Sequence, residues 1–192
     1  MSQQAASVRL GGTERSDARA WRVDTKALVG GVLLGIVLVL VNQVATRLDA
    51  IINPSAGFVS GSTTAIILGL CVRLFRQPAG IIAGEIQALI AIATASNPLA
   101  PAFLITNAVE ALAYSGVLRV WPQNSWRSHF LTQVAGNFAG DLVFMLAVII
   151  LLHVPFVIAL TAIILTFVVN LIISTLVTKP LTDVVERSGV AD

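Results

Sequence analysis

Three acidic residues of this 192-residue chain, Glu85, Glu110 and Asp141, lie inside long apolar stretches of the sequence. A charged side chain in hydrocarbon is costly, and residues of this kind usually serve a function. The same stretches contain no Lys or Arg at a matching depth that could neutralise the acids. Either burial keeps the carboxyl groups protonated, or a cation reaches them. The acids therefore predict a site for a cationic or proton-coupled ligand, with interhelical hydrogen bonding by protonated carboxyl groups as the alternative.

Further polar residues recur at intervals of three or four in the same region, so each set falls on one face of a helix. The sets are Asn107, Glu110 and Tyr114; Gln133, Asn137 and Asp141; and Thr166, Asn170, Ser174 and Thr178. Polar faces in lipid must point at one another or at a wet cavity. We therefore expect three consecutive helices to converge on a polar interior. The predicted substrate-binding residues are Glu85, Asn107, Glu110, Tyr114, Asn137, Asp141 and Asn170.

The spacing of the three acids also predicts their depth. Glu85 and Glu110 each lie about 12 residues from the turn at 97–98, which is roughly 18 Å along a helix at about 1.5 Å per residue. Asp141 lies a similar distance before the later turn at 153–154. If the helices are antiparallel neighbours, all three carboxyl groups share one layer near the middle of the bilayer.

The elements that carry these residues are predicted to be membrane-spanning helices. The chain is 56% hydrophobic and 11% charged, whereas a soluble domain has roughly 25% charged residues. The apolar runs lack the alternation of membrane β-barrel strands. Six spans are predicted, at 27–46, 57–74, 78–95, 100–119, 130–152 and 155–178, with prolines at the joints. The predicted fold class is an all-α integral membrane protein, with one six-helix transmembrane domain at 27–178 between a polar N-terminal tail at 1–26 and a C-terminal tail at 179–192.

Basic residues are unevenly distributed between the two sides of the predicted bundle. With six spans, eleven of the twelve Lys and Arg residues fall on the side of both termini, and only Arg47 falls on the other side. By the positive-inside rule we expect both tails in the cytoplasm and the chain as a multi-pass protein of the plasma membrane.

The sequence argues against several other classes of site. Cys71 is the only cysteine, which excludes a disulfide within the chain and a multi-cysteine metal site. No phosphate-binding glycine loop and no nucleic-acid-binding motif is present. An intramembrane aspartyl protease needs two buried aspartates, and only Asp141 is available. A serine protease needs a buried histidine, and His129 and His153 lie at span ends. We therefore predict no enzyme, no catalytic residue, no metal or cofactor, and no nucleic-acid partner.

Small residues follow the first span at four-residue spacing: Ala27, Gly31 and Gly35. A stripe of this kind lets another helix approach closely. It predicts either packing inside the protein or a docking surface for a partner membrane protein. Two further pairs have the same spacing and are assigned to internal packing: Gly80 with Gly84, and Gly136 with Gly140.

The stretch FRQPAGIIAGEIQALIAIATASNPLAPAFLITNAVEAL, at 75–112, resembles the middle of the S components of energy-coupling-factor (ECF) vitamin transporters. These are small six-helix, substrate-binding membrane proteins of about this length. The stripe on the first span, the basic turn before Pro78 and the acid of the fourth span extend the likeness over most of the chain. Within that family, RQPAGIIAGE with Glu85, and GDLVF with Asp141, are similar to the thiamine or hydroxymethylpyrimidine type.

The resemblance implies a binding subunit, not an enzyme, that captures a scarce vitamin or precursor outside the cell. ATP hydrolysis in separate subunits would then drive uptake. The implied partners are two ATPase subunits and a transmembrane coupling subunit, which would contact the stripe formed by Ala27, Gly31 and Gly35. The remaining alternatives are a stand-alone proton-coupled carrier and a small structural membrane protein of a cell-envelope complex.

Overall fold

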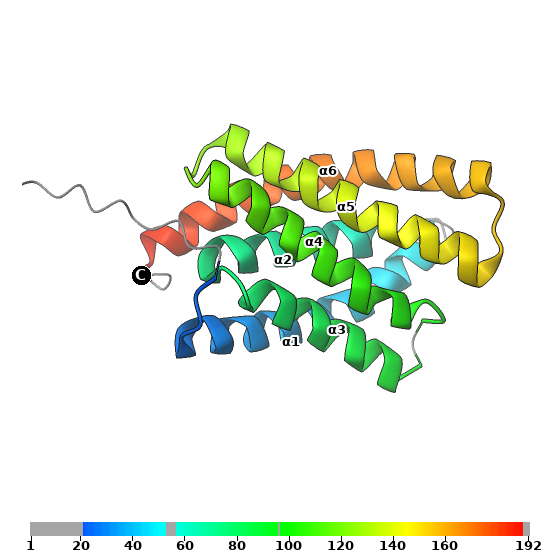
Figure 1. Cartoon of the computed structure of the whole chain (residues 1–192), viewed down its shortest axis with the longest axis horizontal. Coiled ribbons are helices and arrows are strands. Elements are labelled where there is room, and N and C mark those ends of the chain that lie inside the picture. Colours follow the sequence, from blue (N-terminus) through cyan, green and yellow to red (C-terminus); the bar gives the residue numbers. More distant parts are fainter. Residues whose placement is uncertain (1–20, 53–56, 96, 190–192) are drawn as a thin grey trace, which may run out of the picture.

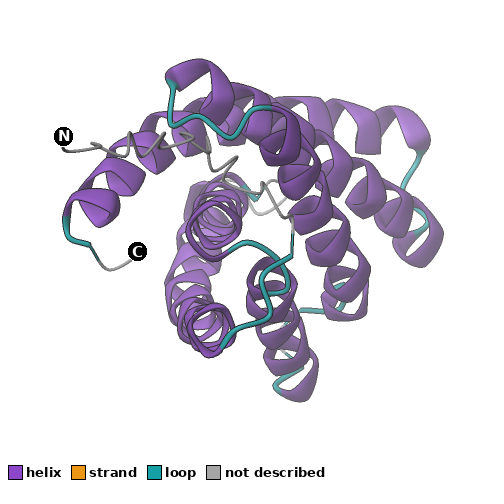
Figure 2. Ribbon diagram, turned by 60° about the vertical axis from the view of Figure 1, so that its left-hand side comes forward, coloured by secondary structure: helices purple, strands orange, loops and turns teal. Residues whose placement is uncertain are grey.

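The structure is a computed structural model that describes residues 21–52, 57–95 and 97–189. These residues form six helices and no β-strand, which confirms the predicted fold class (Figure 2). The helices are α1 (Thr25–Ile52), α2 (Phe58–Phe75), α3 (Ala79–Ala93), α4 (Ala100–Val120), α5 (Trp126–Leu152) and α6 (Phe156–Arg187). They run back and forth along one axis, so that α1 begins and α6 ends at the same end of the bundle, called here the terminal end (Figure 1).

Five of the six helices are long and apolar enough to cross a membrane, and only α3 is shorter. The 15 residues of α3 extend about 22 Å at about 1.5 Å per residue, less than the roughly 30 Å of a hydrocarbon core. Large apolar side chains on the outer faces of α1 and α6 are exposed, including Leu33, Leu40 and Ile172. This distribution suits contact with lipid tails, since a soluble protein rarely exposes apolar patches of such extent.

Local capping explains several helix ends. The Asp24 carboxylate accepts a hydrogen bond from the Ala27 backbone N–H (2.7 Å) and so caps the start of α1. Ser125 caps α5 in the same way, through the Ser128 N–H. At the other extreme, α6 continues through Pro180 to Arg187, nine residues beyond the predicted end of the last span. Most of the predicted C-terminal tail that the structure describes is therefore helical.

The start of α2 is capped from a different helix. Asp49, buried in the last turns of α1, accepts hydrogen bonds from the backbone N–H groups of Val59 (2.7 Å) and Ser60 (2.9 Å). A carboxylate at a helix N-terminus satisfies free backbone donors and interacts favourably with the helix dipole. Asp49 thereby joins α1 to α2 at the end opposite the terminal end.

The stripe of small residues on α1 packs inside the protein. Ala27, Gly31 and Gly35 are all buried. A Cβ added to Gly31 would lie 2.8 Å from the Ala79 carbonyl oxygen, and one on Gly35 would lie 3.0 Å from the Ala83 Cα. The α1 and α3 backbones are therefore in close contact through these residues. In this structure the stripe packs against α3. The docking role for a coupling subunit stays a prediction.

Candidate ligand-binding site

Two glycines of α5 bring α4 and α5 together around the acid of the fourth helix. A Cβ on Gly136 would lie 2.0 Å from the ring of Tyr114, and one on Gly140 would lie 3.1 Å from Glu110 Oε2. Glu110 and Tyr114 are themselves buried. A side chain at Gly136 would force the Tyr114 ring to move, and one at Gly140 would crowd Glu110. The internal packing predicted for Gly136 and Gly140 therefore fits the structure.

A hydrogen-bonded cluster surrounds the Tyr114 hydroxyl. It donates to Glu110 Oε1 at 2.6 Å, and it lies 3.1 Å from Gln133 Oε1 and 3.4 Å from the Ala65 carbonyl oxygen. Asn137 Nδ2 donates to Gln133 Oε1 at 3.0 Å. Glu110, Tyr114, Gln133 and Asn137, called here the central cluster, therefore share one network between α4 and α5, as their helical spacing predicts.

Gln133 connects the central cluster to two more helices. Its Nε2 donates to the Ala65 carbonyl of α2 at 3.3 Å and to Thr178 Oγ1 of α6 at 3.1 Å. Gly69 of α2 faces the same amide, since a Cβ there would lie 2.6 Å from Gln133 Nε2. Gln133 is fully buried. It was not among the predicted binding residues, although its spacing from Asn137 placed it on the right face.

Asp141 adds a second acid beside the central cluster. It follows Gly140, the residue that faces Glu110. Its Oδ2 atom is buried and has no hydrogen-bond partner in the described part of the chain. The structure therefore brings two of the three predicted acids, Glu110 and Asp141, into one layer between α4 and α5. An unpaired buried carboxylate oxygen is costly unless it is protonated or meets a ligand.

Two predicted binding residues lie in separate contacts. Asn107 Nδ2 donates to the Gly84 carbonyl of α3 at 2.8 Å and to Gln87 Oε1 at 2.9 Å. Asn170 Oδ1 accepts from Ser62 Oγ of α2 at 2.8 Å. Each asparagine again lies over a glycine: a Cβ on Gly84 would meet Asn107 at 2.6 Å. Similarly, a Cβ on Gly61 would lie 2.3 Å from Asn170 Nδ2. These two residues fasten α3 to α4 and α2 to α6, respectively.

Glu85 does not join the other acids. The α3–α4 contact pairs Gly84 with Asn107 and Gly80 with Ala111, where added Cβ atoms would lie 2.6 Å and 3.4 Å away. In this register Glu110 lies level with residue 81, about four residues or roughly 6 Å along the helix from Glu85. The predicted layer of three acids is therefore corrected to a layer of two. Glu85 itself is half-buried and has no hydrogen bond within the described residues.

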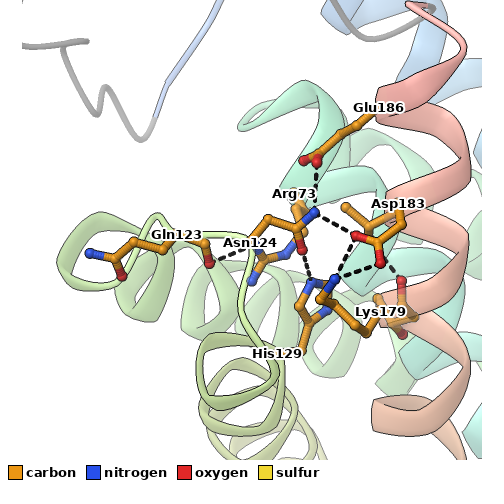
Figure 3. A network of polar contacts seen from close by, with 9 residues as sticks. Arg73, Gln123, Asn124, His129, Lys179, Asp183 and Glu186 are labelled. Carbon is orange, nitrogen blue, oxygen red and sulfur yellow. Dashed lines mark hydrogen bonds and ion pairs between the residues drawn. The ribbon is translucent and has the colours of Figure 1, made fainter.

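A second polar network fixes the α4–α5 pair at the terminal end (Figure 3). Arg73, in the last turn of α2, donates through Nη2 to Ser128 Oγ of α5 at 2.8 Å. Asn124, in the α4–α5 turn, donates to Asp183 Oδ1 (2.8 Å) and Glu186 Oε2 (2.6 Å) of α6. These bonds tie the turn to α2 and α6, and so hold the two helices that carry the central cluster.

Comparison with known proteins gives one informative match. No protein-family model matches the sequence, and no curated protein matches it significantly. A solved structure described as "Crystal structure of an S-component of ECF transporter" superimposes with a TM-score of 0.65 and 18% sequence identity. The match covers 89% of this chain and 88% of that chain. At this identity the likeness extends to the fold, and the chain therefore has the six-helix fold of an ECF transporter S component.

Proposed function

We propose that this chain is the substrate-binding subunit of an ECF-type importer and captures a small cationic vitamin or precursor of the thiamine or pyrimidine kind. The observation that carries the proposal is the acid pair between α4 and α5. Glu110 is buried and Asp141 is half-buried in the same layer, and the buried Asp141 Oδ2 has no partner within the described residues. Neither carboxyl group forms an ion pair with a Lys or Arg among the residues that the structure describes.

The central cluster has the groups needed to bind a flat cationic ring. A carboxylate compensates the positive charge of the ligand, and charge-assisted hydrogen bonds are among the stronger ones in proteins. The amides of Gln133 and Asn137 and the Tyr114 hydroxyl offer donors and acceptors at the same level. In the present structure these groups bond to one another. Binding would exchange some of those bonds for bonds to the ligand.

The fold likeness supports the rest of the proposal. The matched protein is described as a component of an ECF transporter. We accordingly include a transmembrane coupling subunit and two ATPase subunits as partners, and the plasma membrane as the location. The first and last described residues lie at one end of the bundle, where Arg22, Arg119, Arg127 and Arg187 also lie. The positive-inside rule then assigns this end to the cytoplasm.

Calorimetry on the purified protein with thiamine and with hydroxymethylpyrimidine tests the ligand proposal. Asp141→Asn is the sharper variant, because Oδ2 has no partner to lose within the described residues. A charge-assisted hydrogen bond contributes about 1.5–3 kcal/mol, so we expect Asp141→Asn or Glu110→Gln to weaken binding roughly 10- to 150-fold. Affinity for thiamine should also fall as the pH falls, because protons compete for the carboxylates. The comparison is made above the pH at which the aminopyrimidine ring of thiamine gains a proton, where the permanent thiazolium is its only charge.

Glu85→Gln is the matched control, because it neutralises an acid outside the central cluster. Its affinity should equal that of the parent protein. Parent-like binding by the Glu110, Asp141 and Glu85 variants alike would show that the acids are protonated packing groups, and the cation proposal would be wrong. Purification with a coupling subunit and two ATPases separates an importer subunit from a stand-alone proton-coupled carrier, which would purify without them.

A further inference from the structure

Glu85 occupies an unusual place for a carboxylate. It lies near the middle of α3, and its side chain is only half-buried. It forms no hydrogen bond and no ion pair with any residue that the structure describes. An ionisable residue inside a membrane normally faces the bundle interior or a wet cavity, with a partner. Glu85 lies at a mid-membrane depth where an ionisable side chain normally has a partner, but no described residue pairs with it.

The neighbouring residues show which way Glu85 faces. Ala83 of α3 contacts α1 at Gly35, and Gly84 contacts α4 at Asn107. Gly80, one turn earlier, contacts α2 at Val72. Successive residues are about 100° apart around a helix with 3.6 residues per turn. Glu85 therefore lies beyond the α4 contact, on the side of α3 that turns away from the bundle. Leu89, one turn further, is 56% exposed on the adjoining surface.

The length of α3 is an independent sign that this surface is incomplete. The helix extends about 22 Å and is shorter than the hydrocarbon thickness of about 30 Å. A short hydrophobic segment thins the bilayer locally or favours association with another helix. A carboxyl group at mid-depth makes exposure of the same helix to lipid more costly still.

We propose that the face of α3 around Glu85 and Leu89 is a docking surface for a transmembrane helix of another protein. The partner helix would bring a Lys, Arg, Asn or Gln donor to the depth of Glu85. Interhelical hydrogen bonds of this kind are what hold polar residues in membranes. This surface is separate from the proposed ligand site between α4 and α5, and its role does not depend on which ligand binds there.

A second copy of this chain is a poorer occupant of the surface. Most Lys, Arg and His residues in the described helices lie near helix ends, such as Arg73 and Arg119, and Lys179 lies in the part of α6 toward the terminal end. None lies at the depth of Glu85. Two copies related by a twofold axis through this face would place one Glu85 against another, which pairs like charges or requires both to be protonated. The chemistry therefore favours a different protein.

Photocross-linking in the native membrane tests the proposal. A benzophenone amino acid replaces Leu89, and the cross-linked peptide is identified by mass spectrometry. We expect a transmembrane segment of another protein that contains a Lys, Arg, Asn or Gln at mid-depth. Glu85→Leu should lower the cross-linked fraction at sub-saturating partner about 3- to 16-fold, the equivalent of about 0.6–1.7 kcal/mol for an interhelical hydrogen bond at about 1.4 kcal/mol per decade. Glu85→Gln keeps an acceptor oxygen and should retain more cross-linking than Glu85→Leu.

A benzophenone at Ile172, on the outer face of α6, provides the matched control because its neighbours should not change with Glu85. Equal cross-linking yields for the parent, Glu85→Gln and Glu85→Leu proteins would refute the proposal. So would cross-links that join two copies of this chain or reach only lipid. Thiamine calorimetry on Glu85→Leu distinguishes this surface from the ligand site. Unchanged affinity is expected, and loss of binding with intact cross-linking would place Glu85 in the ligand site instead.

Discussion

Replacing Gly31 by Ala tests whether the stripe on α1 is internal packing. A Cβ at this position would lie 2.8 Å from the Ala79 carbonyl oxygen and 2.9 Å from the Ala79 Cα, whereas ordinary contact begins at 3.4 Å. The obstacle is backbone and cannot rotate away. The α1 and α3 helices must therefore separate by 3.4 − 2.8 = 0.6 Å at this point, or the new methyl group must remain compressed.

A matched glycine isolates the packing cost. Gly116 also lies inside a helix, and a Cβ there meets nothing within 4 Å. Gly→Ala in a helix gains about 0.8–1 kcal/mol in propensity, and this gain is common to both variants. Overpacking costs about 1–3 kcal/mol. Gly31→Ala should therefore be less stable than Gly116→Ala by about 1–3 kcal/mol, which corresponds to about 2–12 °C in Tm for a chain of this size.

Cys71 makes the measurement direct, because it is the only cysteine and is fully buried. A thiol-reactive fluorescent dye will report its exposure as the detergent-solubilised protein is heated. If Gly31→Ala is as stable as Gly116→Ala, the close α1–α3 contact is wrong. A Gly31→Ala protein that is stable alone but fails to join a coupling subunit would support the docking role predicted for the stripe.

Two further predictions concern the ends of the bundle. The Ala27 backbone N–H bonded to Asp24 holds the pKa of that carboxyl below its usual value. Its stabilising effect should therefore be present above the unfolded pKa of about 4 and be lost as the pH falls through the lower folded pKa. Thermal scans of tryptophan fluorescence should show Asp24→Ala less stable than the parent at pH 7, with a difference in Tm that shrinks as the pH falls below about 4. A difference that does not shrink would contradict the assignment. Asn124→Ala removes hydrogen bonds to Asp183 and Glu186, each worth about 1 kcal/mol or more. Backbone hydrogen exchange at 121–128 should therefore become roughly tenfold faster or more. Unchanged exchange rates would mean that these bonds do not hold the turn.

The helices were predictable from the sequence because long apolar runs and prolines mark spans directly. The polar face of α4 was also predictable, since spacing of three and four residues places Glu110 and Tyr114 together whatever their neighbours are. The depth of Glu85 was not. Symmetry about the turn at 97–98 assumed a tight antiparallel hairpin, whereas the observed register pairs Gly84 with Asn107. A shift of a few residues in an irregular connection moves a side chain by a helical turn.

Contacts between distant parts of the chain could not be predicted from the sequence, for a different reason. Small-residue spacing shows that a helix can be approached closely, but it does not show which helix approaches, so internal packing and docking at Gly31 looked alike. The Asp49 cap depends on the start of α2 lying beside the last turns of α1, which the sequence does not show. The bond between Ser62 and Asn170 joins residues 108 apart in sequence, and only the assembled bundle brings them together.

The pairing of glycines with larger residues constrains how this protein can evolve. Pairs of this kind between helices include Gly61 with Asn170, Gly69 with Gln133, Gly84 with Asn107, Gly136 with Tyr114, and Gly140 with Glu110. In each pair a methyl group on the glycine would lie closer to its partner than an ordinary contact, so the partner side chain would have to shift, and a smaller partner would leave space over the glycine. A substitution at one member alone should lower stability. A paired substitution that places the larger residue on the opposite helix can leave stability nearly unchanged. Among related sequences these positions should therefore covary in pairs, and a change of ligand preference would need coordinated substitutions on two helices.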